Sequence, residues 1–200
     1  MQLTQGLKRA AQINAGGLAT CIMGPDGHER RRTWSETVDR VSRLAGAMHG
    51  LGLGKGDRAA ILALNSDRYY EFFFGTAWAG GVFVPINIRL APPEVAYWLN
   101  DSEAKILFID AMFAPMLKAL EGSIPHVEQV IYLGDDAAPE GMHSYEALVA
   151  GAEPVPDADC GYEDLAGLFY TGGTTGRSKG VMLSHRNLVV NLSLIHISEP

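Results

Sequence analysis

Residues 170–180 hold the side chains whose types and spacing could most readily do chemistry, and they read Y-T-G-G-T-T-G-R-S-K-G. Glycines let a backbone turn through positive φ and bring its N–H groups close to an anion. Hydroxyls and a lysine supply further donors and positive charge, and together these groups favour phosphate. The stretch is therefore predicted to bind phosphate, and the candidate ligands are Thr171, Gly172, Gly173, Thr174, Thr175, Gly176, Arg177, Ser178 and Lys179.

The segments on either side of this stretch must position it. Apolar residues 165–170 predict a short buried strand, and residues 184–190 predict a helix that begins at Ser184. In that order the helix N-terminus would face the anion. Two better-known phosphate motifs are excluded, because Ser178 rather than glycine precedes Lys179 and the glycine spacing does not fit G-x-G-x-x-G. An ordinary glycine turn is the alternative.

The rest of the chain alternates between strand and helix patterns. A helix over residues 32–51 is favoured by apolar residues at helical spacing and by a capping box of Thr33 and Glu36. The connections are short, so the strands are expected to lie parallel in one sheet that is covered by helices on both faces, an α/β fold. The further predicted strands are 58–64, 82–86, 105–110 and 127–133, and the further predicted helical segments are 67–79, 92–99, 112–120 and 145–149.

Several other features could be functional, and a structural interpretation is favoured for each. The glycine-rich residues 50–56 lack hydroxyls and follow a helix, which favours a helix C-terminal turn over a second phosphate site. The aromatic residues of 67–79 are expected to form core rather than a ligand box. Asn87 and Arg89 are expected to fix a strand-to-helix turn rather than to line a site. The carboxylates of 137–159, a proline-rich surface excursion, are expected to be solvated rather than catalytic.

Composition narrows the class of protein. The 200 residues are 47% hydrophobic and 20% charged, as in ordinary globular proteins. A net charge of -7 argues against a general nucleic-acid binder, and no apolar run is long enough to predict a transmembrane helix. The two cysteines, Cys21 and Cys160, lie far apart in sequence, which favours a reducing, cytoplasmic setting. The six histidines show no metal-ligand spacing, so no structural zinc is predicted.

Residues 170–180 resemble the signature of the adenylate-forming (AMP-binding) superfamily, Y-T-S-G-T-T-G-x-P-K-G, which includes acyl-CoA synthetases, aryl-CoA ligases, luciferases and amino-acid adenylation domains. The sequence departs at two positions, Gly172 where serine is usual and Ser178 where proline is usual. Residues 181–187, 84–102 and 52–61 are also similar to family patterns, the second of them P-x-N-x-R-L-x-x-x-E-[LI]-x-Y-x-L. The matching signature residues are Thr171, Gly173, Thr174, Thr175, Gly176, Lys179 and Gly180.

This resemblance implies an ATP-dependent acyl-CoA synthetase that joins a carboxylic acid to coenzyme A through an acyl adenylate. The glycine-rich loop would hold the β- and γ-phosphates of ATP, with Mg²⁺ sharing their charge and its ligands lying further along the chain. A fatty-acid–CoA ligase is the first expectation, because the loop continuation and the N-terminal segment resemble that branch most. An aryl-acid or amino-acid adenylating enzyme is the alternative, and a nucleotide-phosphate binder without turnover is another.

The last residues stand apart from this resemblance. Residues 192–200, L-S-L-I-H-I-S-E-P, resemble the in-frame translation of a transposon-derived sequencing adapter. Residues 1–191 are therefore expected to be part of an N-terminal adenylation domain, and 192–200 are expected not to be native, so His196 is not taken as a ligand. A natural helix continuation is the alternative. Family members are more than twice this length, so the chain is expected to be inactive as an isolated fragment.

Overall fold

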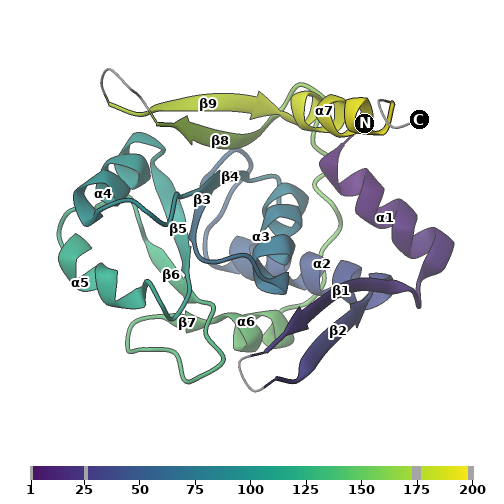
Figure 1. Ribbon diagram of the computed structural model, residues 1–200, viewed down its shortest axis with the longest axis horizontal. Helices are drawn as coiled ribbons and strands as arrows, with labels where there is room; N and C mark the ends of the chain where they lie inside the picture. The colour runs from purple at the N-terminus through teal and green to yellow at the C-terminus, as the bar shows by residue number, and fades with distance from the viewer. Residues whose placement is uncertain (1, 25–26, 173–176, 198–200) are drawn as a thin grey trace.

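The computed structural model describes residues 2–24, 27–172 and 177–197, with side chains described up to residue 191. Within these residues a seven-stranded sheet has the strand order β7-β6-β5-β3-β4-β8-β9 (Figure 1). Neighbouring strands from β7 to β8 are parallel, and β9 alone runs antiparallel to its neighbour β8, so the predicted α/β class and parallel sheet are confirmed. The strands are β3 (Arg58–Leu62), β4 (Val82–Pro85), β5 (Ala104–Ile109), β6 (Gln129–Tyr132), β7 (His143–Ser144), β8 (Leu165–Thr171) and β9 (Lys179–Ser184).

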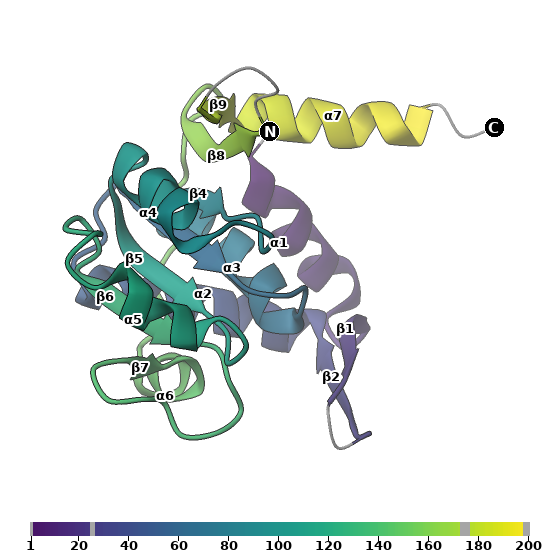
Figure 2. The same ribbon diagram turned by 60° about the vertical axis from the view of Figure 1, so that its left-hand side comes forward.

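Helices cover both faces of the sheet, as predicted (Figure 2). Alternate residues of a strand point to opposite faces, so Ala59 and Ile61 of β3 join one buried core while Ala60 and Leu62 join the other. The first core is completed by α1 (Leu3–Asn14), α2 (Trp34–Gly50), α3 (Asp67–Trp78) and α6 (Tyr145–Gly151). The second is completed by α4 (Pro92–Asp101) and α5 (Leu117–Leu120), with the 3-10 turn η1 (Ala114–Met116) before α5. No helix in the described part of the chain is both long and apolar enough to cross a membrane.

Helix α2 shows how local sequence sets an element's limits. Thr33 is its N-cap, and the Thr33 hydroxyl accepts from the Glu36 amide while the Glu36 carboxylate accepts from the Thr33 amide, so the predicted capping box is confirmed. At the other end the amides of Leu51 and Leu53 donate to carbonyls of the last turn, and Gly52 has φ +91°. Positive φ is a conformation that glycine adopts without a Cβ clash. The interpretation of residues 50–56 as a helix end is confirmed.

The aromatic residues of α3 pack into the core, as expected. Phe72 is fully buried and meets Phe108 of β5 edge-on, with 4.9 Å between ring centroids. Phe73 meets Phe83 of β4 in the same way at 4.6 Å. These contacts fix α3 on the sheet and leave no ligand box there.

Two N-terminal elements were not predicted from the sequence. Helix α1 precedes an antiparallel hairpin of β1 (Leu18–Met23) and β2 (Glu29–Thr33). Helix α1 is held by side chains far along the chain, since the Thr4 hydroxyl and the Lys8 ammonium both donate to Asp157, at 2.7 and 2.6 Å. Such long-range contacts leave no local sequence pattern.

Candidate phosphate-binding site

The glycine-rich segment joins two antiparallel strands rather than a strand and a helix. Thr171 at the end of β8 pairs with Lys179 at the start of β9, and Tyr170 pairs with Gly180. The helix α7 (His185–Ile197) begins only after β9, so the predicted strand-loop-helix order is wrong. The six residues 179–184 form the second strand of the hairpin and pair antiparallel with β8. Pairing with a neighbouring strand stabilises such a short stretch as a strand. The N-terminus of α7 therefore follows the end of β9 that is farther from the Thr171–Lys179 pair.

The predicted start of that helix is nevertheless confirmed. The Ser184 hydroxyl accepts from the Asn187 amide at 3.3 Å, and the Asn187 side-chain oxygen accepts from the Ser184 amide at 3.0 Å. This reciprocal pair satisfies two groups at the helix N-terminus, as in a capping box. His185, the first residue of α7, is 1% exposed, and its Nδ1 accepts from the Leu3 amide at 3.4 Å, which ties α1 to this end of the molecule.

Five of the nine candidate ligands lie in the described part of the chain. Thr171 and Lys179 face each other across the hairpin and both are exposed. Gly172 and Arg177 are also exposed, and Ser178 is partly buried. A Cβ added to Gly172 would meet no atom within 4 Å, so space does not require glycine there. The other four candidates, Gly173, Thr174, Thr175 and Gly176, lie outside the described residues.

The two cations of the segment, Arg177 and Lys179, have no carboxylate partner among the described residues. Within the described residues Lys179 has no carboxylate partner, and Arg177 makes no ion pair but lies over the Tyr97 ring, 5.5 Å from guanidinium carbon to ring centroid. An exposed lysine opposite a threonine can approach an anion without first breaking an ion pair. The described part of the hairpin thus presents two exposed cations that no carboxylate of the described residues neutralises.

Helix α4 contacts both ends of the segment, and the sequence reasoning assigned it no role. The Tyr97 hydroxyl donates to the Ser178 carbonyl at 3.1 Å. The Trp98 ring stacks on the Tyr170 ring, with centroids 4.7 Å apart and an angle of 19°. The Tyr170 hydroxyl donates to Asp101 at 2.6 Å, and burial together with this acidic partner raises the Tyr170 pKa above its usual range. The signal in the sequence that could have indicated this contact is Tyr97, which occupies the tyrosine position of the family pattern E-[LI]-x-Y-x-L.

A cavity of about 460 Å³ lies between α4 and the hairpin. Asn87 lines it, but the Asn87 side-chain oxygen is engaged by the Arg89 amide at 3.0 Å. This bond fixes the turn between β4 and α4, as predicted, but Asn87 also borders the cavity beside the candidate ligands, so the two interpretations do not exclude each other. The cavity is bordered by Asn87, Leu90, Pro93, Glu94, Tyr97, Trp98, Tyr170, Gly172, Arg177 and Ser178.

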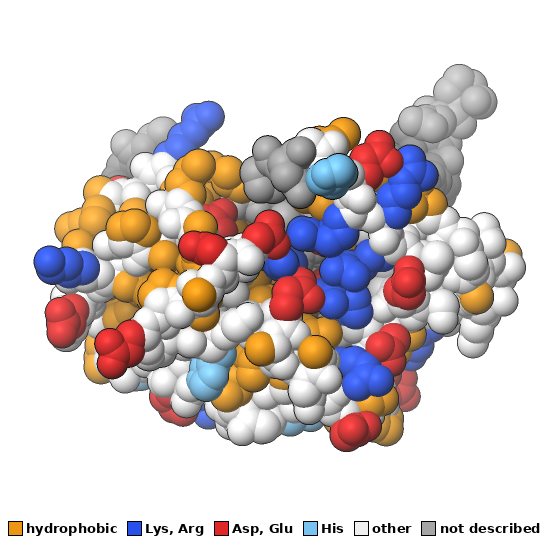
Figure 3. Space-filling model, turned by 90° about the horizontal axis from the view of Figure 1, so that it is seen from below, with side chains coloured by type: hydrophobic (Ala, Val, Ile, Leu, Met, Phe, Trp, Pro, Cys, Tyr) orange, Lys and Arg blue, Asp and Glu red, His pale blue; other side chains and the backbone are white. Residues whose placement is uncertain are grey.

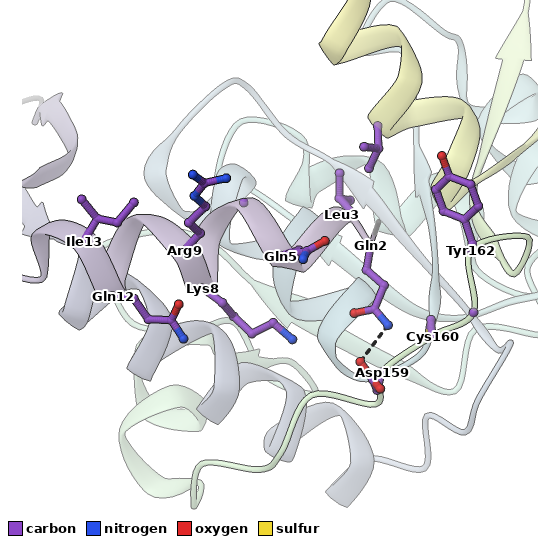
Figure 4. Close-up of a pocket in the computed structure, with 13 residues that line it drawn as sticks. Gln2, Leu3, Gln5, Lys8, Arg9, Gln12, Ile13, Asp159, Cys160 and Tyr162 are labelled. Atoms are coloured by element: carbon purple, nitrogen blue, oxygen red, sulfur yellow. Dashed lines mark hydrogen bonds between the residues drawn. The ribbon is translucent and has the colours of Figure 1, made fainter.

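A second and larger cavity, of about 1200 Å³, lies beside α1 (Figure 4). Gln2 donates to Asp159 across it at 2.7 Å. Cys160 lines it, but burial raises the pKa of that thiol, which disfavours the reactive thiolate. None of the five predicted phosphate ligands in the described part of the chain borders this cavity.

Two carboxylates of residues 137–159, those of Glu146 and Asp157, are not simply solvated, contrary to expectation, whereas Glu140 and Glu153 are exposed as expected. Glu146 accepts from Arg40 at 2.9 Å and from Arg68 at 2.9 Å, and Asp157 accepts from Lys8 and Thr4. Figure 3 views the molecule from below and shows basic and acidic side chains side by side on that face. These acids are occupied by ion pairs, and the structure gives them no catalytic geometry.

A parallel sheet with helices on both faces and a glycine-rich hairpin at one end is the arrangement of the N-terminal portion of adenylate-forming enzymes. The chain belongs to the AMP-binding enzyme family, whose model matches residues 8–199. It superposes on the crystal structure of the anthranilate CoA ligase AuaEII in complex with anthranoyl-AMP with a TM-score of 0.91 at 27% identity, covering 99% of this chain and 37% of that one.

Two curated relatives show the range of enzymes that are similar to this chain. The long-chain-fatty-acid–CoA ligase of Thermus thermophilus is 40% identical over 166 residues, which are 82% of this chain and 30% of the relative. The 3-hydroxybenzoate–CoA/4-hydroxybenzoate–CoA ligase of Thauera aromatica is 33% identical over 163 residues, 81% of this chain and 31% of the relative. The chain thus spans about a third of the length of the curated relatives that it matches.

Proposed function

We propose that this chain supplies the phosphate-binding loop of an ATP-dependent acid–thiol ligase. Such an enzyme lets a carboxylate oxygen attack the α-phosphorus of ATP, which breaks the bond to the β-phosphate oxygen and releases pyrophosphate. The thiolate of coenzyme A then attacks the acyl carbon and AMP leaves. The observation that carries the proposal is the exposed Lys179, free of a carboxylate partner among the described residues, on a hairpin that matches the family signature.

In this proposal the loop stabilises the charge that develops on the departing pyrophosphate. Lys179 and the Thr171 hydroxyl approach it from opposite strands, and Gly172, Gly173, Thr174, Thr175, Gly176, Arg177 and Ser178 add backbone N–H groups and hydroxyls. Donors fixed in place where charge develops lower the barrier. The described residues hold no cluster of three acids, histidines or cysteines suited to a metal, and we propose that Mg²⁺ arrives with the ATP phosphates and is held by residues beyond this segment.

For the carboxylic acid we propose a fatty acid, with an aryl acid or an amino acid as the alternative. The fatty-acid–CoA ligase of Thermus thermophilus supports the first choice at 40% identity, while the hydroxybenzoate ligase of Thauera aromatica supports the second at 33%. Both thiols, the exposed Cys21 and the buried Cys160, are free, which supports our proposal of a cytoplasmic location.

The deciding experiment is Lys179→Ala in the protein expressed from its complete gene, with pyrophosphate release measured in the presence of ATP, Mg²⁺ and fatty acids. We expect release to slow by about 100-fold or more, because removing one donor at developing charge has effects on that order. The matched control is Lys118→Ala, which removes an exposed lysine from α5, a helix that borders neither the hairpin nor the 460 Å³ cavity. An unchanged rate in Lys179→Ala would refute the role of this lysine.

A second candidate function is phosphate binding without turnover by the 200-residue chain. Incubation of that chain with ATP, Mg²⁺, fatty acids and hydroxylamine separates the two, because an acyl adenylate is trapped as a hydroxamate. We expect no hydroxamate from the chain alone.

Sequencing the gene across the codon of Asn191 tests the related proposal that residues 1–191 are part of an adenylation domain and residues 192–200 are adapter-derived. A genomic frame that encodes 192–200 would refute the adapter proposal.

A further inference from the structure

Consecutive residues of α4 hold the two ends of the glycine-rich segment. Tyr97 contacts the end that leads into β9, through Arg177 and Ser178, and Trp98 contacts the end that leaves β8, through Tyr170. Both α4 residues come from one turn of a helix whose Val95 and Leu99 are fully buried against the sheet. A helix anchored in this way offers a rigid base for the segment.

The contact at Ser178 falls where the hairpin's own bonds stop. The last paired residues of the hairpin are Thr171 and Lys179, so Ser178 is the first residue beyond the strand ladder. Its carbonyl accepts from the Tyr97 hydroxyl, 81 residues earlier in the chain. Serine has no ring to restrict φ as proline would, so the direction of the chain at residue 178 depends on such an external contact.

The Tyr97 ring adds a second contact to the neighbouring residue. The Arg177 guanidinium lies over it at 5.5 Å, within the range of cation–π attraction. One side chain therefore contacts two successive residues immediately before Lys179. At the opposite end the stacked Trp98 and the carboxylate of Asp101 hold the Tyr170 ring and hydroxyl.

We propose that Tyr97 is a positioning residue for phosphate binding. It fixes the chain at Arg177 and Ser178, so that Lys179 and its backbone neighbours meet the anion in one geometry. This inference rests on the proposed phosphate-binding role of the loop. Tyr97 itself does not touch phosphate, and it acts through the Ser178 carbonyl and the Arg177 side chain.

The test uses Tyr97→Phe, which removes the hydroxyl and keeps the ring. Affinity for inorganic tripolyphosphate with Mg²⁺ is measured by calorimetry on the protein expressed from its complete gene. We expect a loss of about fivefold, the equivalent of one neutral hydrogen bond. Tyr97→Leu, which also removes the ring, is expected to lose more. The control is Tyr132→Phe at the far side of the sheet, where a hydroxyl that donates to Asp136 at 2.7 Å is lost in the same way.

A second readout separates positioning from general stability. Trypsin cuts after Arg177 and Lys179, and mass spectrometry gives the rate at these two bonds. We expect Tyr97→Phe to raise that rate several-fold in the absence of any ligand, with the urea unfolding midpoint no lower than that of Tyr132→Phe. In the complete enzyme the KM for ATP should rise while the KM for the carboxylic acid stays unchanged.

The outcomes distinguish this inference from the function on which it rests. If the unmodified protein binds no tripolyphosphate, the phosphate-binding role fails, and the tryptic rates alone then decide whether Tyr97 holds the segment. Unchanged affinity and unchanged cleavage in Tyr97→Phe would overturn the positioning role. A fall in the urea midpoint that accounts for all the extra cleavage would also overturn it, because it would show a purely structural role.

Discussion

Two regions of this molecule use charged side chains in opposite ways. Where β2, α2, α3 and α6 meet, arginines and acids are paired with one another in or near the interior. Asp67 and Glu71 of α3 have side chains that are 1% exposed, yet each lies against arginine guanidinium groups. At the β8–β9 hairpin the cations are exposed, and in the described residues neither Arg177 nor Lys179 has an acidic partner.

The difference separates charges that hold the fold together from charges that are available to a ligand. A buried charge must be paired because its desolvation is costly. Glu71 accepts from Arg40 at 2.8 Å and from the Tyr145 hydroxyl at 2.6 Å, so its oxygens are already engaged. An exposed lysine stays hydrated, so its charge carries little desolvation cost before an anion binds. Charge density alone would therefore point to the paired region, where the charged groups are already engaged with one another.

The largest effect is expected from breaking the buried network at Glu71→Ala. This change removes one of the two carboxylates that Arg40 contacts and takes away the described partner of the Tyr145 hydroxyl, and the loss of one member of a buried pair costs about 3–5 kcal/mol. The free energy of unfolding in urea, followed by circular dichroism, measures it. The control is Glu29→Ala, because Glu29 pairs with Arg31 in an exposed position and its removal should leave the urea midpoint unchanged. Equal effects of the two changes would contradict the comparison.

A smaller loss is expected when acid titrates the same network. Burial raises the pKa of Asp67, but hydrogen bonds and charge from Arg30 and Arg32 outweigh it, and the pKa lies below its ordinary value. For Glu146, burial is likewise outweighed by Arg40 and Arg68, and the pKa is lowered. Unfolded carboxyls therefore take up protons at higher pH than folded ones, so this stability is complete above about pH 5 and is lost as pH falls through the folded pKa values.

The measurement is the urea midpoint from pH 7 down to pH 3. Glu146→Gln should reduce the slope below about pH 4.5, because one of the groups with a lowered pKa is gone. A slope that stays the same in this variant would show that other carboxyls carry the acid sensitivity.

Local sequence was sufficient wherever short-range physics sets the structure. The capping box at Thr33, the cap at Ser184 and the glycine turn after α2 each depend on residues within about one helical turn, and each was predicted. From α2 to β8, the order of the strands and helices apart from the two-residue β7 followed from periodicity and short connections. These are the features for which neighbours in sequence are also neighbours in space.

Long-range contacts explain what the sequence could not show. Arg40 and Glu146 are 106 residues apart, and Tyr97 and Ser178 are 81 apart, so no spacing rule joins them. Residues 179–184 were not predicted as a strand because only three of the six are apolar and most are exposed, so they lack the buried apolar pattern that identified the other strands. Residue types were enough to predict the candidate ligands. They did not predict the contacts that Tyr97 and Trp98 of α4 make with Ser178 and Tyr170.

His185, at the start of α7, should make the free energy of unfolding depend on pH more weakly than the buried carboxylates do, and at higher pH. Burial lowers its pKa, and the nearby Asp164 and Asp157 oppose that shift only in part. The unfolded chain therefore binds a proton at higher pH than the folded one, and stability declines as pH falls below about 6.5. His185→Asn keeps an acceptor for the Leu3 amide and should flatten the urea midpoint between pH 6.5 and 5. A decline that persists in this variant would assign it to another group.

The smallest effect on stability is expected from Lys179→Ala, and it tests the comparison most directly. Lys179 is exposed and makes no ion pair with the described residues, so its removal should change the free energy of unfolding by no more than about 0.5 kcal/mol. Urea unfolding measures this on the same preparation used for pyrophosphate release. If Lys179→Ala is as stable as the unmodified protein and defective in release, then its charge serves the ligand. A loss of stability comparable to that of Glu71→Ala would instead mean that Lys179 has an internal partner, and the distinction between the two regions would fail.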